Sequence, residues 1–214
     1  MAVGTLLNAI ARVTGQPRQI HANERDELLT SNGLPHYTES TRKGQRMATM
    51  ATAAVAALVV RPTTTAALEI FNNTGAIGPA MAMIVTRLFT HELVTSTTGL
   101  GGGAGLYAMI TTPKAAPTDA ALAINSLSGK PAPTKVVLTA ASTTVADNGW
   151  FPYGVHIKKE SAGAVVPGGG AEALIDGRLI VPPGCSLCLH VVSGYTGDTF
   201  TSGAEWVFEP LTLL

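Results

Sequence analysis

The chain has 214 residues and a formal net charge of +0; 13% of its residues are charged and 46% are hydrophobic. Soluble domains usually have about 25% charged residues, so copies of this chain repel one another weakly and tend to associate. The length fits one domain of about 150 residues with an extension. This composition favours a protein that is assembled with other subunits over a catalyst.

The sequence changes character near Val60–Pro62. The first 61 residues hold seven of the 14 Lys and Arg residues but only four of the 14 acidic ones, which leaves seven bases and ten acids for the rest. Short apolar runs separated by Gly and Pro follow this change. We therefore expect an extended, partly helical N-terminal arm, residues 1–61, that anchors a β domain, residues 62–214.

The arm begins with apolar residues at the spacing of one helix face. Gly15 and Pro17 then give stop signals, and a second short helix is expected from Asn23, a good N-cap, to Leu29. Isolated helices below about 12–15 residues are marginal in water, so each must dock, either on its own body or on a neighbouring subunit. The apolar residues expected at this contact are Val3, Leu6, Leu7, Ile10 and Val13.

The end of the arm combines a polar connection with an apolar stretch. Leu34–Thr49 has no periodicity and is expected to be extended, whereas Met47–Val60 is apolar and rich in Ala. A membrane span needs about 18–20 residues, more than this stretch has, so no membrane partner is expected. We expect it to lie as a strand on a neighbouring subunit. Its candidate contact residues are Val55, Leu58 and Val59.

Past residue 61 the chain predicts short strands separated by turn signals, and no helix. This pattern is typical of a mainly β protein with an antiparallel β-sandwich or jelly-roll body. Asp176-Gly177 lies inside one predicted strand and is either a two-residue hairpin turn or part of a continuous strand. The predicted strands are Thr65–Asn72, Met81–Thr97, Leu106–Thr111, Lys135–Ser142, Phe151–Lys158, Glu172–Val181, Ser186–Ser193 and Ala204–Glu209.

The motifs that could carry chemistry are weak. Gly99–Ala104 fits a dinucleotide-binding pattern, but the segment before Pro113 is too short for the helix that would hold a pyrophosphate. Cys185 and Cys188 are three positions apart, so on a strand they point to opposite faces and are expected to be small buried hydrophobes. We expect no catalytic residues, no cofactor and no metal.

Two further surface signals point away from nucleic acid and, less firmly, from sugars. The basic cluster of Arg42, Lys43 and Arg46 lacks the interleaved aromatic residues of a nucleic-acid surface, so no nucleic-acid partner is expected. Trp150 and Trp206 are expected in a core or an interface, although an exposed tryptophan could stack on a sugar.

The chain resembles a known family in the order of five short strings. The strings are Leu34–Glu39, Ala51–Val60, Pro62–Thr65, Gly177–Gly184 and Ala204–Val207. In this order they resemble small virion structural proteins of tailed bacteriophages, whose β body is a jelly-roll-like sandwich. The resemblance covers most of the chain from about residue 34 and offers no catalytic residues to carry over.

The resemblance implies a role in the virus particle. The expected function is that of a non-enzymatic capsid decoration or cement protein, or another particle-surface subunit, found in the virion after assembly in the host cytoplasm. The expected partners are other copies, with a trimer favoured, and virion proteins such as the major capsid protein. The alternative is a carbohydrate- or receptor-binding module of a fibre or tail with a host glycan as ligand, because loops of jelly rolls commonly host such sites.

Overall fold

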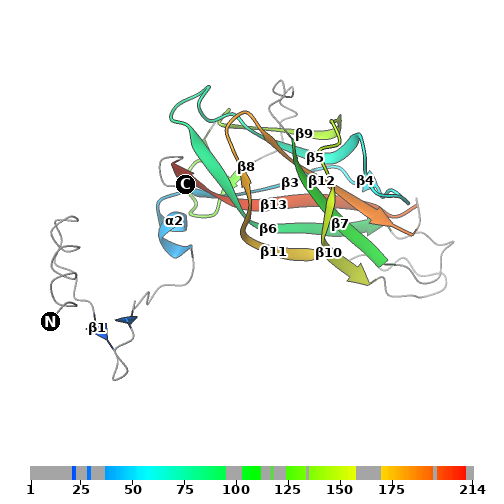
Figure 1. Ribbon diagram of the computed structural model, residues 1–214, viewed down its shortest axis with the longest axis horizontal. Helices are drawn as coiled ribbons and strands as arrows, with labels where there is room; N and C mark the ends of the chain where they lie inside the picture. The colour runs from blue at the N-terminus through cyan, green and yellow to red at the C-terminus, as the bar shows by residue number, and fades with distance from the viewer. Residues whose placement is uncertain are drawn as a thin grey trace. The chain divides into compact units, whose positions relative to one another are not determined.

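A computed structural model gives the fold of the chain (Figure 1). It describes residues 21–22, 28–29, 37–94, 103–111, 117, 124–133, 135–157, 170–194 and 197–210. The chain divides into two compact units, Met1–Thr38 and Glu39–Leu214. The second unit is called the body below.

The first unit contains a two-stranded antiparallel ladder. Its strands are β1 (His21–Ala22) and β2 (Leu28–Leu29), with His21 opposite Leu29. Leu28 and Leu29, the last residues of the expected second helix, therefore lie in a strand. Paired strands satisfy each other's backbone groups, whereas a seven-residue helix would leave most of its own unpaired. The first predicted helix, with the apolar stripe from Val3 to Val13, lies outside the described residues.

The body consists of two antiparallel sheets, so the prediction of a mainly β protein is confirmed. The six-stranded sheet has the order β11-β6-β13-β3-β8, with β4 paired to β13, and the five-stranded sheet has the order β10-β7-β12-β5-β9. Figure 1 shows β11, β6 and β13 side by side. The strands of the six-stranded sheet are β3 (Arg46–Met50), β4 (Val55–Ala56), β6 (Met81–Val94), β8 (Ile124–Ser126), β11 (Glu172–Val181) and β13 (Thr199–Pro210). Those of the five-stranded sheet are β5 (Thr65–Asn72), β7 (Gly103–Thr111), β9 (Val137–Thr144), β10 (Phe151–Ile157) and β12 (Ser186–Ser193).

The end of the predicted arm belongs to the body. Within Leu34–Thr49, where an extended connection was expected, α2 (Thr38–Arg42) is a short helix, whereas the residues that belong to strand β3 are extended. Met47 on β3 lies opposite Trp206 on β13 and is buried in the core. The body therefore begins at Glu39, ahead of the boundary expected at Pro62. The reason is that the apolar stretch Met47–Val60 pairs with β13 of its own chain.

One hydrophobic core joins the two sheets in a sandwich-like arrangement. Leu68 and Leu187 come from the five-stranded sheet, and Val85 and Trp206 come from the six-stranded sheet. These alternate residues of each strand face inward because successive strand residues point to opposite faces. Trp206 is fully buried and meets Phe208 edge to face at a centroid distance of 6.3 Å, so the predicted core position of this tryptophan is confirmed.

Asn72 ties the two sheets together at one corner. Its side-chain N–H groups donate to the carbonyl oxygens of Met81 and Val181, both at 2.9 Å, and its Oδ1 accepts from the Thr74 hydroxyl at 2.7 Å. The residue is completely buried. A buried amide with these partners is well satisfied, so the end of β5 is fixed relative to β6 and β11 in the other sheet.

Strand β11 is continuous but bulged at Asp176-Gly177. Its register against β6 shifts between Leu174 and Leu179, and both Asp176 and Gly177 have positive φ angles of 46° and 83°. The Arg178 guanidinium donates to the Leu174 carbonyl oxygen at 2.7 Å across the bulge. Of the two alternatives for this dipeptide, the structure has the continuous strand, with an irregularity that absorbs the extra residues.

Candidate functional site

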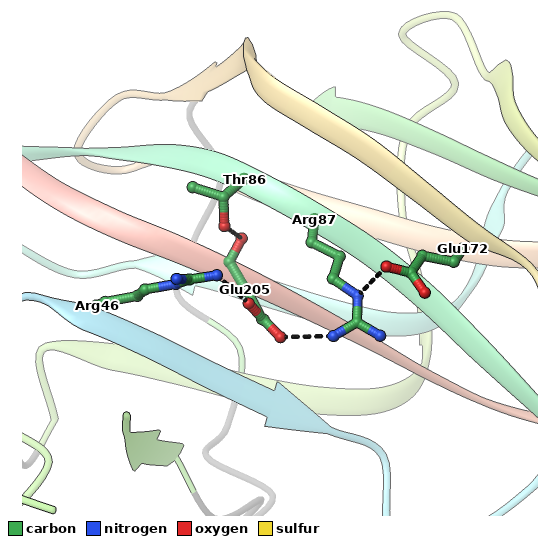
Figure 2. Close-up of polar contacts among 5 residues, drawn as sticks. All are labelled: Arg46, Thr86, Arg87, Glu172 and Glu205. Carbon is green, nitrogen blue, oxygen red and sulfur yellow. Dashed lines mark hydrogen bonds and ion pairs between the residues drawn. The ribbon is translucent and has the colours of Figure 1, made fainter. Parts of the chain in front are cut away.

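Four charged side chains form a ladder of ion pairs on the outer face of the six-stranded sheet (Figure 2). Glu205 on β13 accepts hydrogen bonds from Arg46 Nη2 on β3 at 2.7 Å and from Arg87 Nη1 on β6 at 2.9 Å. Arg87 Nε lies 2.7 Å from Glu172 Oε1 on β11, an ion-pair contact and not an aligned hydrogen bond. The Glu205 side chain is only 10% exposed, so this carboxylate is the buried centre of the ladder.

Backbone irregularity and a glycine position the ladder. In the pairing of β6 with β13, Arg87 lies opposite Glu205, while Thr86 is an extra residue whose hydroxyl donates to the Glu205 carbonyl oxygen at 3.2 Å. The Phe89 ring lies over Gly203, where an added Cβ would come within 2.4 Å of the ring. The Arg87 guanidinium carbon is 5.1 Å from the centroid of the same ring, which adds a cation–π contact.

The ladder is an electrostatic surface and not an acid–base pair. Its charges alternate in sign across four neighbouring strands, from Arg46 through Glu205 and Arg87 to Glu172. Each oxygen of the Glu205 carboxylate accepts from a guanidinium, so a substrate would have to displace an arginine to exchange a proton with it. This arrangement cross-links four neighbouring strands.

The outer face of the five-stranded sheet carries a second, fully buried polar group. The Ser186 hydroxyl on β12 donates to Glu69 Oε1 on β5 at 2.7 Å, and the Ser186 N–H donates to the Thr111 hydroxyl on β7 at 3.2 Å. His190 lies four residues along β12 from Ser186, or about 13 Å away at strand spacing. That separation is too long for a serine–histidine pair, so these side chains link three strands instead.

His190 is buried and held as a neutral ring. The Val191 N–H donates to His190 Nδ1 at 2.8 Å, which assigns the ring proton to Nε2. Burial lowers the pKa of His190 below its ordinary value of 6.5, and a contact with the Val191 carbonyl oxygen opposes this shift. The histidine is therefore a core residue that resists protonation.

Residues 61–64 and 145–150, called the strap below, cover part of this face. Trp150 packs in a cluster with Met109 and Cys188, and its indole N–H donates to the Thr63 carbonyl oxygen at 3.0 Å. Trp150 is thus buried, as predicted from the sequence.

An exposed ion pair joins the two halves of the strap. Arg61 donates to both carboxylate oxygens of Asp147, at 2.9 and 3.0 Å. These hydrogen bonds, with a further one from the Gly149 N–H, hold the pKa of Asp147 below its ordinary value. The pair is solvated, so it orients the strap more than it stabilises the fold.

An open groove with a volume of about 420 Å³ lies where β3 begins and β13 ends. Apolar side chains form most of its wall, and two lysines lie beside them. An apolar group with an acid next to it would fit this lining. The main lining residues are Met47, Met81, Val136, Phe208, Lys43 and Lys130.

The predicted contact residues of the arm are distributed differently from the expectation. Val55 and Leu58 are half-buried in the body: Val55 lies on β4 opposite Phe200, and the Leu58 N–H donates to the Val191 carbonyl oxygen at 3.0 Å. Val59 is exposed. The other five, Val3, Leu6, Leu7, Ile10 and Val13, lie outside the described residues.

Two of the sequence motifs lie partly or wholly within the described residues. Strand β7 starts at Gly103, so the glycine-rich pattern leads into a strand and not into a phosphate-binding helix. Cys185 and Cys188 are buried in different apolar clusters, as expected. Among the described residues no cluster of three potential metal ligands occurs, and no described helix has the length and apolarity for a membrane span.

No protein-family model, curated protein or solved structure matches the chain. The resemblance to virion proteins of tailed bacteriophages therefore stays a prediction. The ladder was not predicted from the sequence. Its one signal is that Arg87 and Glu205 are single charges inside otherwise apolar runs, the pattern of charges that find partners across strands.

Replacing Glu205 by Gln should lower the free energy of unfolding by about 1–3 kcal/mol. The loss is smaller than the roughly 3–5 kcal/mol of a fully buried broken pair because both arginines keep access to water. Denaturant titration of E205Q measures it. The matched control D147N, which removes the exposed strap pair, should cost markedly less. An E205Q protein that unfolds at the wild-type denaturant midpoint would show that the ladder contributes nothing.

Stability should fall as the pH drops below 6.5, the ordinary pKa of histidine. Below this pH the unfolded chain binds a proton on His190, whereas the folded chain does not because its His190 has a lowered pKa. Protonation therefore favours the unfolded state and lowers the free energy of unfolding. Each such group contributes at most about 1.4 kcal/mol per pH unit. Measurement of the unfolding free energy between pH 5 and 8 should give a shallower slope for H190Q than for the wild type. Equal slopes for H190Q and wild type would contradict the assignment.

Proposed function

We propose that the body is a jelly roll. The supporting observation is the nesting of its eight main strands: β3 pairs with β13, β5 with β12, β6 with β11 and β7 with β10. The first main strand thus pairs with the last, the second with the second-last, and so inward. Strands β8 and β9, inserted between β7 and β10, each add an outer strand to one sheet. Jelly rolls recur in viral capsid proteins and in lectins.

Within that fold, we propose that the chain is a non-enzymatic structural subunit of a bacteriophage virion, a decoration or other particle-surface protein that assembles with copies of itself. The phage assignment comes from the resemblance in sequence. The single structural observation that supports assembly is the apolar edge strand β10. Phe151 is 63% exposed and Val155 is 73% exposed.

Strand β10 is an edge strand without charged side chains. It is the outermost described strand of the five-stranded sheet, and its sequence from Phe151 to Ile157 contains no Lys, Arg, Asp or Glu. Edge strands that stay in water generally carry charges, Pro or a bulge to prevent pairing with other chains; β10 has Pro152 and a bulge between Pro152 and Gly154 but no charge. An apolar, uncharged edge is therefore best explained by a neighbouring subunit that covers it.

The glycan-binding alternative receives less support. Sugar sites on jelly rolls rely on aromatic platforms, and both tryptophans of this chain are buried, at 3% and 0% exposure.

The chain should be a stoichiometric component of gradient-purified particles of the virus that encodes it. Quantitative mass spectrometry should find a fixed ratio to the major capsid protein. V155K should be lost from particles while remaining folded, because it places a charge on the covered edge. I77K, at an exposed loop position with 43% exposure, is the matched control and should be retained. Purified particles without the chain would contradict the function, and V155K retained at the wild-type ratio would contradict the role of the β10 edge.

A further inference from the structure

Four residues form one straight row across the outer face of the six-stranded sheet. Leu174 on β11 lies opposite Arg87 on β6, Arg87 lies opposite Glu205 on β13, and Glu205 lies opposite Ala48 on β3. Directly opposed residues of antiparallel strands point to the same face. In spatial order, the row therefore contains a large apolar residue, a cation, an anion and a small apolar residue.

This row is complementary to itself when it is reversed. Turned end for end, it places Leu174 over Ala48 and Arg87 over Glu205, so each residue meets one of fitting size or opposite charge. A two-fold axis that runs parallel to the strands, between β6 and β13, performs this reversal. We propose that a second copy of the chain docks face to face on this sheet about such an axis, which deepens the proposed function by assigning one of its self-contacts.

The exposure of the residues in and beside the row supports a face that a second copy covers. Leu174 is 62% exposed, and Met50 on the adjacent row is half-exposed. Ala48 is partly exposed and has the smallest side chain of the row. A solvated face of an antiparallel sheet normally alternates apolar-in with polar-out, and Leu174 breaks that pattern. Covering this leucine with the alanine end of a second copy removes it from water without a clash.

The centre of the face suits a two-fold axis. The Phe89 ring of β6 lies over Gly203 of β13, so it reaches the line between these two strands (Figure 2 shows the neighbouring Arg87 and Glu205). A side chain on a two-fold axis meets its own copy. Two Phe89 rings would stack there, flanked by Arg87 and Glu205 pairs that alternate in sign between the copies.

Two-fold docking also agrees with known sheet packing. Sheets packed face to face keep their strand directions within about 30° of each other and lie about 10 Å apart. An axis parallel to the strands gives this aligned class. Asn125 on β8 continues the row beyond Ala48 and would lie past the edge strand of the other copy, where a polar side chain stays in water.

The test exchanges the large and the small side chain at the two ends of the row. L174A leaves a gap over Ala48 of the second copy, and A48L places leucine on leucine, so each homodimer has two faulty contacts. Sedimentation of the full-length chain over a concentration series should give a dimer Kd at least about tenfold higher for each single variant. The double variant A48L/L174A restores the fit and should return to within about threefold of wild type.

Mixing the two single variants provides the decisive measurement. In a mixed dimer, the leucine introduced by A48L in one chain meets the alanine introduced by L174A in the other, and the second contact is wild type. Fluorescently labelled A48L should therefore dimerise with unlabelled L174A at concentrations where neither associates with itself. Within one chain, residues 48 and 174 are three strand spacings apart, about 14 Å, so no intramolecular contact produces this rescue.

Each outcome decides the inference. I77A is the matched control, and a loss of association by I77A as large as that by L174A would overturn the inference. Single variants that weaken association without rescue on mixing would also overturn it. If all variants associate like wild type, self-association and the proposed function stand but this face is not the contact. A wild-type chain that stays monomeric at all concentrations would overturn both proposals.

Discussion

The pairing of β6 with β13 is the constraint on which the rest of the body depends. It extends from Met81 opposite Pro210 to Val94 opposite Thr199 and joins segments more than a hundred residues apart in the chain. β11 extends the sheet from β6, β3 extends it from β13, and Trp206 on β13 is the largest fully buried side chain. A slip of one residue would turn Trp206 outward and Glu205 into the core, so burial and charge both enforce this register.

Ion pairs between charged side chains of the body fix the positions of its strands and of the strap. Glu205 cross-links three strands through Arg46 and Arg87, while Arg61 and Asp147 join the two halves of the strap. Charges that form such contacts do little to keep copies apart in solution, and only 13% of the residues are charged. The exposed apolar residues of β10, and Leu174 on β11, likewise favour the association of copies. Low charge, an apolar edge strand and a sheet face with a reversible row of residues are the features on which the proposed assembly rests.

Local patterns predicted the strands that have clear turns on both sides. Strands β5, β11 and β12 begin and end at the predicted residues, because apolar runs bounded by Gly, Pro and Asn need no distant information. For β3 the sequence predicted a strand within Met47–Val60 but placed it on a neighbouring subunit, because its pairing with the distant β13 leaves no signal in the local sequence. The ladder and the row across the sheet were missed for the same physical reason: they depend on register between strands that are distant in sequence. Turn chemistry is local, whereas register is set by packing.

Native-state hydrogen exchange of the full-length chain tests most directly whether β6 and β13 form the organising pair. Their amides should exchange slowest, with one common opening free energy equal to that of global unfolding, while the short edge strand β8 opens at lower free energy. Uniform protection of β6 and β13 in a denaturant series would agree with a body that unfolds around this pair. Amides of β13 that open separately at low free energy, while those of β6 stay protected, would contradict it.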